Sequence, residues 1–116
     1  MPKEKLRHVT LVGHMGSGKS TIGSLLGKLM NYDHADLDVV IANQAGRSIG
    51  VIFAEKGEKI FRDLEEQALE SKLSTPDPLV ISTGGGIVER SSNRRLLQEK
   101  SFVIWLHTDI KTLVKR

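Results

Sequence analysis

The sequence predicts an α/β domain in three layers, with a parallel sheet between two layers of helices. Four short β-rich runs alternate along the chain with segments of helical periodicity, the order expected of such a fold. The first and last runs are apolar throughout, as strands are when helices cover both faces of a sheet. With 116 residues, the chain suits a single domain over residues 1–116.

The first strand and helix flank a glycine-rich loop. Residues 8–12 (HVTLV) form a short β-rich run that ends at Gly13. From Ser20 onward, apolar side chains recur at helical spacing, at Ile22, Leu25, Leu26 and Leu29. The predicted order is therefore strand, loop and helix.

A second strand and a short helix follow. Residues 31–38 carry a weaker strand pattern that ends in two carboxylates, Asp36 and Asp38. A short apolar helix through Ile41 comes next and stops near Gly46. Asp36 and Asp38 are therefore expected at the C-terminal end of a strand.

The second half of the chain repeats this alternation. Ser48 can cap a first helical turn, and a longer amphipathic helix is expected after Gly57. Residues 79–81 form a third strand that leads directly into three glycines. A further helix opens at Ser91 or at the serine after it, and residues 102–106 form the fourth strand.

Composition excludes several kinds of function. The 17 basic and 14 acidic residues are interleaved rather than gathered in one stripe, so nucleic-acid binding is not expected. The absence of cysteine excludes disulfides and thiolate metal sites and favours a reducing compartment, the cytoplasm. The apolar run after the charged first seven residues is too short to cross a membrane. The histidines lack the spacing of metal ligands.

The loop after the first strand has the signature of a phosphate-binding loop. Residues 13–20 (GHMGSGKS) fit G-x-x-x-x-G-K-[ST] between a strand and a helix. Backbone N–H groups can close around phosphate oxygens, while Lys19 reaches the β and γ phosphates and Ser20 offers a hydroxyl to Mg²⁺. His14 is expected to contribute only its backbone N–H. The expected cofactors are ATP and Mg²⁺, and the expected binding residues are Gly13, His14, Met15, Gly16, Ser17, Gly18, Lys19, Ser20 and Thr21.

Three strand ends are expected to meet at one crevice, because ligands of open α/β sheets bind beyond the C-terminal ends of the strands. These ends carry the phosphate loop, the pair Asp36 and Asp38, and glycines 84–86. Two carboxylates at such a point can divide their roles, one facing the metal through water and the other accepting a proton from a hydroxyl nucleophile. The alternative is a pair that caps the following helix.

Two further groups each have a structural and a functional interpretation. Arg62 precedes Glu65 and Glu66 by three and four residues on one predicted helix, so surface ion pairs alone could explain the cluster. Glycines 84–86 can present bare N–H groups to an anion or a polar substrate, or they can form a tight turn. The residues alone leave both alternatives open.

Four motifs in this order resemble the shikimate kinase family. They begin at Gly13 (G-x-M-G-S-G-K-S-T), Asp36 (D-x-D), Phe61 (F-R-D-x-E-E) and Thr83 (T-G-G-G), and the similarity covers essentially the whole chain. It implies a P-loop kinase fold, with four strands here where the family has five. It also implies transfer of phosphate from MgATP to the 3-hydroxyl of shikimate, on the route to aromatic amino acids.

The resemblance implies roles for particular side chains. Asp38 would hold the substrate hydroxyls and act as the base, while Asp36 would support the Mg²⁺ shell with Ser20. Arg62 would grip the substrate carboxylate, which a guanidinium matches in shape, and Glu65 would orient Arg62. The implied catalytic residues are Lys19, Asp38 and Asp36. The implied substrate-binding residues are Asp38, Arg62, Glu65, Gly84, Gly85, Gly86, Phe53 and Phe61.

The family continues past this chain, through a lid, a fifth strand and a final helix. Arg116 matches the family arginine that stacks on adenine, so the resemblance implies a chain that stops where the lid begins. Reduced activity is expected without the lid. The full-length family is expected to be monomeric, whereas residues 102–106 would leave an apolar sheet edge through which this chain self-associates.

Two other functions stay open at this point. A kinase of another small hydroxy acid, such as gluconate, shares the phosphate loop, although nothing obvious there explains the other three motifs together. A chain without the lid could also bind nucleotide without catalysis, as a regulatory or interaction module.

Overall fold

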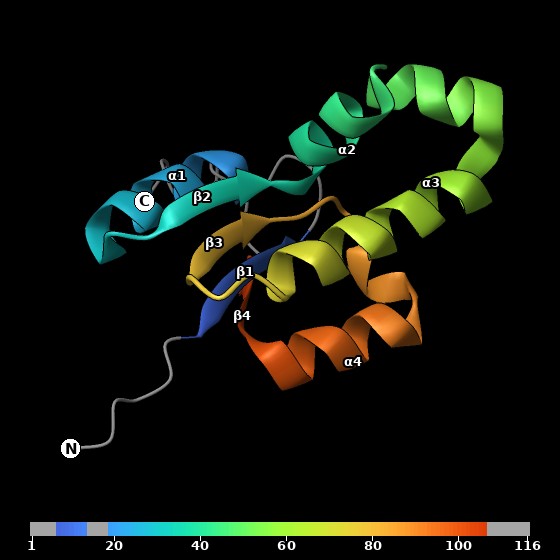
Figure 1. Ribbon diagram of the computed structural model, residues 1–116. Helices are drawn as coiled ribbons and strands as arrows, with labels where there is room; N and C mark the ends of the chain where they lie inside the picture. The colour runs from blue at the N-terminus through green and yellow to red at the C-terminus, as the bar shows by residue number, and fades with distance from the viewer. Residues whose placement is uncertain (1–6, 14–18, 107–116) are drawn as a thin grey trace, which may run out of the picture.

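The computed structural model describes residues 7–13 and 19–106. Within them, four parallel strands form one sheet in the order β2-β3-β1-β4 (Figure 1). The strands are β1 (His8–Gly13), β2 (Asp33–Asp36), β3 (Leu79–Ser82) and β4 (Ser101–Leu106). The predicted α/β fold with a parallel sheet is confirmed.

Helices lie on both faces of this sheet. They are α1 (Lys19–Met30), α2 (Leu37–Ala45), α3 (Ile49–Leu73) and α4 (Ser91–Lys100), and a 3₁₀ turn, η1 (Ile87–Glu89), precedes α4. α1 covers one face, α3 and α4 cover the other, and α2 leads from β2 into α3 (Figure 1). Among the helices of the described ranges, none is long and apolar enough to cross a bilayer.

Alternation of side chains along the strands separates two apolar clusters. Val9, Leu11 and Val80 form the smaller one, on which Ile22 and Leu26 of α1 pack. The larger cluster lies on the side of α2, α3 and α4. Its buried members are Val12, Leu37, Ile41, Ile52, Phe61, Ala68, Leu69, Leu73, Ile81, Ile87 and Leu97. Most of the core therefore lies on the α3 side, and the layer between α1 and the sheet is thin.

α1 contacts the sheet through glycines as well as through part of its predicted apolar face. Gly23 and Gly27 are buried, whereas Leu25 is exposed and Leu29 is 84 % exposed. A Cβ at Gly23 would overlap Ser82 Oγ, so the helix lies too close to the sheet for a side chain at that point. The periodicity therefore predicted the helix correctly, but of its four apolar positions only Ile22 and Leu26 pack on the sheet.

Backbone geometry confirms most of the predicted helix limits. Ser48 caps α3 with its side chain, and Gly46 ends α2 at a φ of 69°, in the left-handed region. Gly57 interrupts α3 at a φ of 89°, so the longer helical segment starts after it, as predicted. α4 begins at Ser91, but the capping residue is Arg90, which makes no side-chain capping bond.

β4 is the outer strand of the described sheet, next to β1. Val103 packs against the larger apolar cluster and Ile104 against the smaller one. Phe102 and Trp105, in contrast, are 57 % and 50 % exposed. The prediction that this strand is covered on both faces is therefore wrong for Phe102 and Trp105, because the described helices cover only part of it.

Candidate active site

The C-terminal ends of three neighbouring strands meet at one edge of the sheet, as predicted. β1 ends at Gly13, β2 at Asp36 and β3 at Ser82. Asp36 and Ser82 are paired in register. Thr83 donates its hydroxyl and its backbone N–H to the carbonyl oxygen of Leu11, at 2.8 and 3.3 Å. These pairings place the segments that follow the three strands on one side of the molecule.

Asp36 joins the first helix to the second. Its Oδ2 accepts a hydrogen bond from Ser20 Oγ at 2.8 Å. Its Oδ1 accepts from the backbone N–H groups of Asp38 and Val39, at 3.0 and 3.3 Å. The helix-capping interpretation is confirmed for Asp36, and its other oxygen remains turned to Ser20. Asp38 lies in the first turn of α2 rather than in the strand, because Asp36 already caps the helix.

Lys19 is a buried cation at the start of α1. It is 8 % exposed, and its Nζ donates to the carbonyl oxygen of Gly13 at 2.9 Å. Burial lowers the pKa of Lys19, and the charges of Asp38 and Asp36 work against that shift. The ammonium group therefore lies near the end of β1 and near two carboxylates, at the start of a helix whose dipole favours anions.

Asp38 and Glu65 form a partly buried acidic centre. A Cβ at Gly84 would lie 3.4 Å from Asp38 Oδ1 and 3.4 Å from Glu65 Oε2, so the glycine loop passes close to both carboxyl groups. Burial raises the pKa of Asp38, whereas the charges of Lys19 and Arg62 work against the rise. Asp38 thus has a raised proton affinity while it interacts with two cations from different elements.

Arg62 is held by acidic side chains of its own helix. Its Nη1 donates to Glu65 Oε1 at 3.0 Å, and its Nε lies 3.6 Å from Glu58 Oε2. Burial works to lower the pKa of Arg62, but the hydrogen bond to Glu65 and the carboxylate charges around it raise it. Glu65 is only 1 % exposed. The surface ion-pair interpretation is therefore wrong for Arg62 and Glu65.

Two buried atoms of this pair, Arg62 Nε and Glu65 Oε2, have no hydrogen-bond partner within the described part of the chain. Buried polar atoms are costly unless a ligand or water satisfies them. One of these atoms belongs to a cationic donor group and the other is an acceptor. The arrangement suits a ligand that carries both a carboxylate and hydroxyl groups.

The loop after β3 passes very close to the end of the Arg62 side chain at Gly86. A Cβ at Gly86 would lie 2.5 Å from both terminal nitrogens of Arg62. The φ of Gly86 is −100°, which any residue can adopt. The tight-turn interpretation is confirmed, because the N–H of Ile87 donates to the carbonyl oxygen of Gly84 at 3.4 Å, but this turn does not itself require glycine at position 86. Gly84, Gly85 and Gly86 together carry the loop across Asp38, Glu65 and Arg62.

Phe53 and Phe61 lie beside the guanidinium. Their ring centroids are 4.7 Å apart, and Arg62 Cζ lies 5.4 Å from the centroid of the Phe61 ring. Phe61 is buried, while Phe53 is partly exposed. The ring of Phe61 thus supports Arg62 through a cation–π contact, and Phe53 extends the same apolar wall toward solvent.

Two polar residues that support the glycine loop were not expected from the sequence. Asn93 Nδ2 donates to the carbonyl oxygen of Ile87 at 2.9 Å. Arg90 Nη1 pairs with Asp63 Oδ1 and Glu66 Oε1, at 2.9 and 3.0 Å. The F-R-D-x-E-E motif is therefore divided between two faces of α3. Within the motif, Arg62 and Glu65 are three residues apart, and so are Asp63 and Glu66. This spacing is the only feature of the sequence that indicates the division.

Part of the predicted nucleotide site lies outside the described residues, namely His14, Met15, Gly16, Ser17, Gly18 and Arg116. Gly13 ends β1, and Lys19, Ser20 and Thr21 begin α1. In the described ranges, no three or more His, Cys, Asp or Glu side chains are grouped so as to hold a metal. Mg²⁺ does not need such a group, because it keeps several waters and binds through one or two protein groups together with phosphate.

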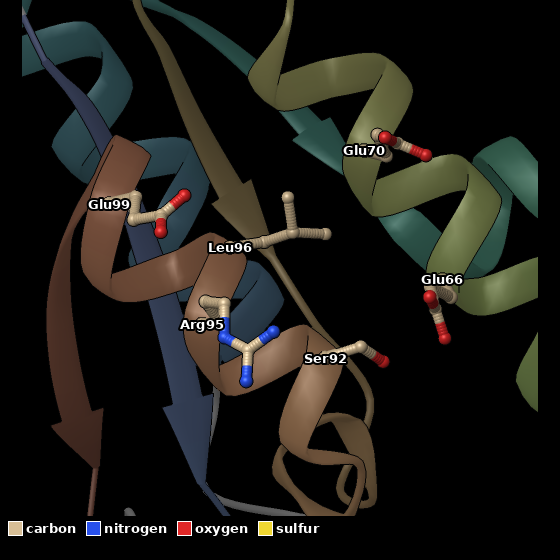
Figure 2. Close-up of a pocket in the computed structure, with 6 residues that line it drawn as sticks. All are labelled: Glu66, Glu70, Ser92, Arg95, Leu96 and Glu99. Atoms are coloured by element: carbon tan, nitrogen blue, oxygen red, sulfur yellow. The ribbon is translucent and has the colours of Figure 1, made fainter.

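A separate hollow of about 230 Å³ lies between α3 and α4 (Figure 2). Its lining combines three glutamates with one arginine, an excess of negative charge that does not suit a phosphate. The lining residues are Glu66, Glu70, Ser92, Arg95, Leu96 and Glu99. The nucleotide is therefore expected at the strand ends and not in this hollow.

Comparison with known proteins agrees with the motifs and the fold. A family model described as shikimate kinase matches residues 15–116. The chain belongs to the shikimate kinase family. The shikimate kinase of Persephonella marina is 45 % identical over 111 residues, which make up 96 % of this chain and 67 % of that protein.

Solved structures show the same fold. A shikimate kinase from Acinetobacter baumannii in complex with shikimate has a TM-score of 0.87 and 35 % identity, and the match covers 97 % of this chain and 63 % of that one. A gluconokinase from Sinorhizobium meliloti has a TM-score of 0.65 at 18 % identity, and the match covers 97 % of this chain and 64 % of that one. At this identity the likeness shows the fold alone. The chain spans between 58 % and 67 % of the length of its first curated relatives in the family.

Proposed function

We propose that the protein transfers the γ-phosphoryl group of ATP to the 3-hydroxyl of shikimate, giving shikimate 3-phosphate and ADP. The observation that carries the proposal is the position of Asp38, a partly buried carboxylate that interacts with both Lys19 and Arg62. Lys19 begins the phosphate-binding helix, and Arg62 offers a guanidinium to an acid. Asp38 therefore lies between the expected donor and acceptor ends of the site.

The acceptor end is built around Arg62. A guanidinium can hold a carboxylate through two parallel hydrogen bonds, which fixes the orientation of the acid. The buried Glu65 Oε2 has no hydrogen-bond partner among the described residues and can accept from a substrate hydroxyl. The ring of Phe61 and the backbone at Gly86 confine the guanidinium from two sides.

The nucleotide end is built around the start of α1. Lys19 supplies a positive charge to the β and γ phosphates, and backbone N–H groups of the phosphate loop supply hydrogen bonds. Ser20 and Asp36, already joined by a hydrogen bond, would hold Mg²⁺, with Asp36 acting through water. When bound, the ion supplies charge that offsets the negative oxygens of the transferring phosphoryl group.

Asp38 is the proposed base. As the 3-hydroxyl oxygen bonds to the γ-phosphorus, its proton passes to Asp38, and the bond from the γ-phosphorus to the bridging oxygen breaks to release ADP. A base works best when its pKa is near the operating pH, and burial moves the pKa of Asp38 in that direction. The family membership and the shikimate complex of the Acinetobacter relative support the choice of acceptor. We place the reaction on the route to aromatic amino acids, in one domain.

A coupled ADP-release assay with shikimate and a panel of sugar acids, beside ATP calorimetry, tests the proposal. We expect bound ATP and ADP release with shikimate, and little release with gluconate. Faster turnover of gluconate would assign the chain to kinases of another hydroxy acid. ATP binding without phosphorylation of any acceptor would indicate a nucleotide-binding module.

A further inference from the structure

A partly buried chain of hydrogen bonds lies beneath the first turn of α1. Ser82, at the end of β3, is 2 % exposed, and its Oγ donates to the backbone carbonyl oxygen of Lys19 at 2.9 Å. His34 Nε2 lies 2.8 Å from the same hydroxyl. Strand alternation turns Ser82 to the α1 side together with Val80. A histidine of β2 and a serine of β3 are thus connected to the backbone of the phosphate-loop lysine.

The direction of both hydrogen bonds follows from the groups involved. A carbonyl oxygen can only accept, so the single hydroxyl proton of Ser82 goes to Lys19 O. The hydroxyl can then only accept from His34, which means that His34 Nε2 carries a proton. His34 therefore holds the Ser82 hydroxyl in the orientation that supports Lys19.

α1 rests directly on this pair. A Cβ at Gly23 would lie 2.7 Å from His34 Nε2 and would overlap Ser82 Oγ, so only glycine allows this approach. On the neighbouring strand, Asp36 is in register with Ser82 and accepts from Ser20 Oγ. Consecutive residues of α1, Lys19 and Ser20, are therefore each held by the end of a different strand.

We propose that His34 and Ser82 are positioning residues for nucleotide binding, which fix the backbone at Lys19 so that its ammonium group meets the phosphates. The inference rests on the proposed function only in taking ATP as the ligand. Lys19 is buried, and displacement by about 1 Å at such a site can cost up to about 10²-fold in rate. Ser82 is buried beneath α1 and bonds to the backbone of Lys19, so we expect its effect to pass through Lys19.

Calorimetry with MgATP and, separately, with shikimate tests this proposal on Ser82→Ala, His34→Leu and the double variant. Loss of one buried hydrogen bond should weaken ATP binding by about three- to tenfold in each single variant. Shikimate affinity should stay within about twofold. Both side chains act through one chain of hydrogen bonds. The double variant should therefore bind ATP only slightly less tightly than the single variant with the lower ATP affinity.

Two controls make the comparison specific. His34→Gln retains an N–H donor in the side chain, so ATP affinity should stay within about twofold of the wild type. Ser24→Ala changes a serine on the exposed side of α1 and should have no effect. Thermal melting shows which variants are folded.

Folded Ser82→Ala and His34→Leu with wild-type ATP affinity would overturn the proposal, as would equal losses of ATP and shikimate affinity. If the wild type binds ATP but phosphorylates no acceptor, the proposed reaction is wrong. The comparison of ATP affinities then still tests the role of His34 and Ser82. A wild type that binds no ATP would overturn both.

Discussion

Asp38 shows how the surroundings of a single residue set its chemistry. Burial and the charge of Asp36 raise its pKa, whereas Lys19 and Arg62 work against the rise. In Asp36→Asn the side-chain oxygen can still cap α2, but the negative charge is lost. Carbon NMR of the Asp38 carboxyl group should give a pKa above 3.8 in the wild type and a lower one in this variant. A pKa that does not fall would show that the two carboxylates are not coupled.

The raised pKa of Glu65 predicts that the stability of the protein depends on pH. Burial raises its pKa in the folded state above 4.5, so the folded protein binds this proton more tightly than the unfolded chain does. This contribution to stability is fully present below the pKa that Glu65 has in the unfolded chain. It is lost as the pH rises through the pKa that Glu65 has in the folded protein. From pH 4.5 toward neutrality, the free energy of unfolding from urea titrations should therefore fall less in Glu65→Gln than in the wild type. Identical slopes in both proteins would contradict this expectation.

Arg62→Lys tests the acceptor end of the site. An ammonium group keeps the charge but cannot make two parallel hydrogen bonds to a carboxylate, so the KM for shikimate should rise by at least about tenfold. The KM for ATP should stay within about twofold, because Arg62 lies on α3 and not on the phosphate helix. Steady-state kinetics with each substrate varied in turn provides the measurement. Equal increases in the KM values for both substrates would indicate that Arg62 has only a structural role.

The site residues that the sequence predicted are those whose type and spacing carry the chemistry. Lys19, Ser20 and Asp36 came from short motifs at strand ends, and the structure places them at one edge of the sheet. His34 and Ser82 could not be found in this way. Their contact depends on the register between β2 and β3, which no local pattern records.

Among the elements, α1 shows where periodicity is informative and where it is not. Apolar spacing predicted the helix, but the close contact with the sheet is made at Gly23, which a search for apolar residues overlooks. In the loop after β3, the backbone at Gly86 lies close to the end of the Arg62 side chain, while the φ of Gly86 would suit any residue. In both cases the close neighbour of the glycine is distant in sequence.

Two helical glycines provide a matched test of this close packing. Gly23→Ala would push α1 from Ser82 and His34 and should lower the free energy of unfolding by about 1 to 3 kcal/mol. Gly50→Ala has open space around its Cβ and should be neutral or stabilising by up to about 1 kcal/mol. Chemical denaturation of both variants gives the comparison. A Gly23→Ala protein as stable as Gly50→Ala would show that α1 can shift without cost.

At the scale of the whole molecule, the sequence predicted the layers and the parallel sheet but not how far its outer strand is covered. The apolar run of β4 indicated burial on both faces, yet half of the Trp105 surface and more than half of that of Phe102 are exposed. Strand order decides this outcome, because β4 lies at an edge of the described sheet. Order in a sheet is set by long-range pairing, which hydropathy along one strand does not contain.

The exposed side chains of β4 predict self-association of the 116-residue chain at micromolar concentration, because apolar side chains on an outer strand favour edge-to-edge contact. Phe102→Lys should increase the fraction of monomer in light scattering. Leu29→Lys, which changes an exposed apolar residue on α1, should have a smaller effect. A wild type that stays monomeric, or equal effects of both changes, would exclude β4 as the contact.

In the proposed reaction, one site brings the γ-phosphate of ATP to a hydroxyl of an acid held by Arg62, with Asp38 as the base. Phosphorus NMR of the protein with MgATP and shikimate tests it most directly, because the signal identifies the product. The wild type should produce a shikimate phosphate monoester together with an equal amount of ADP, and Asp38→Asn should slow its formation by about 10² to 10⁴. Absence of the monoester with the wild type would exclude the proposed reaction, and its formation at an unchanged rate in Asp38→Asn would exclude Asp38 as the base.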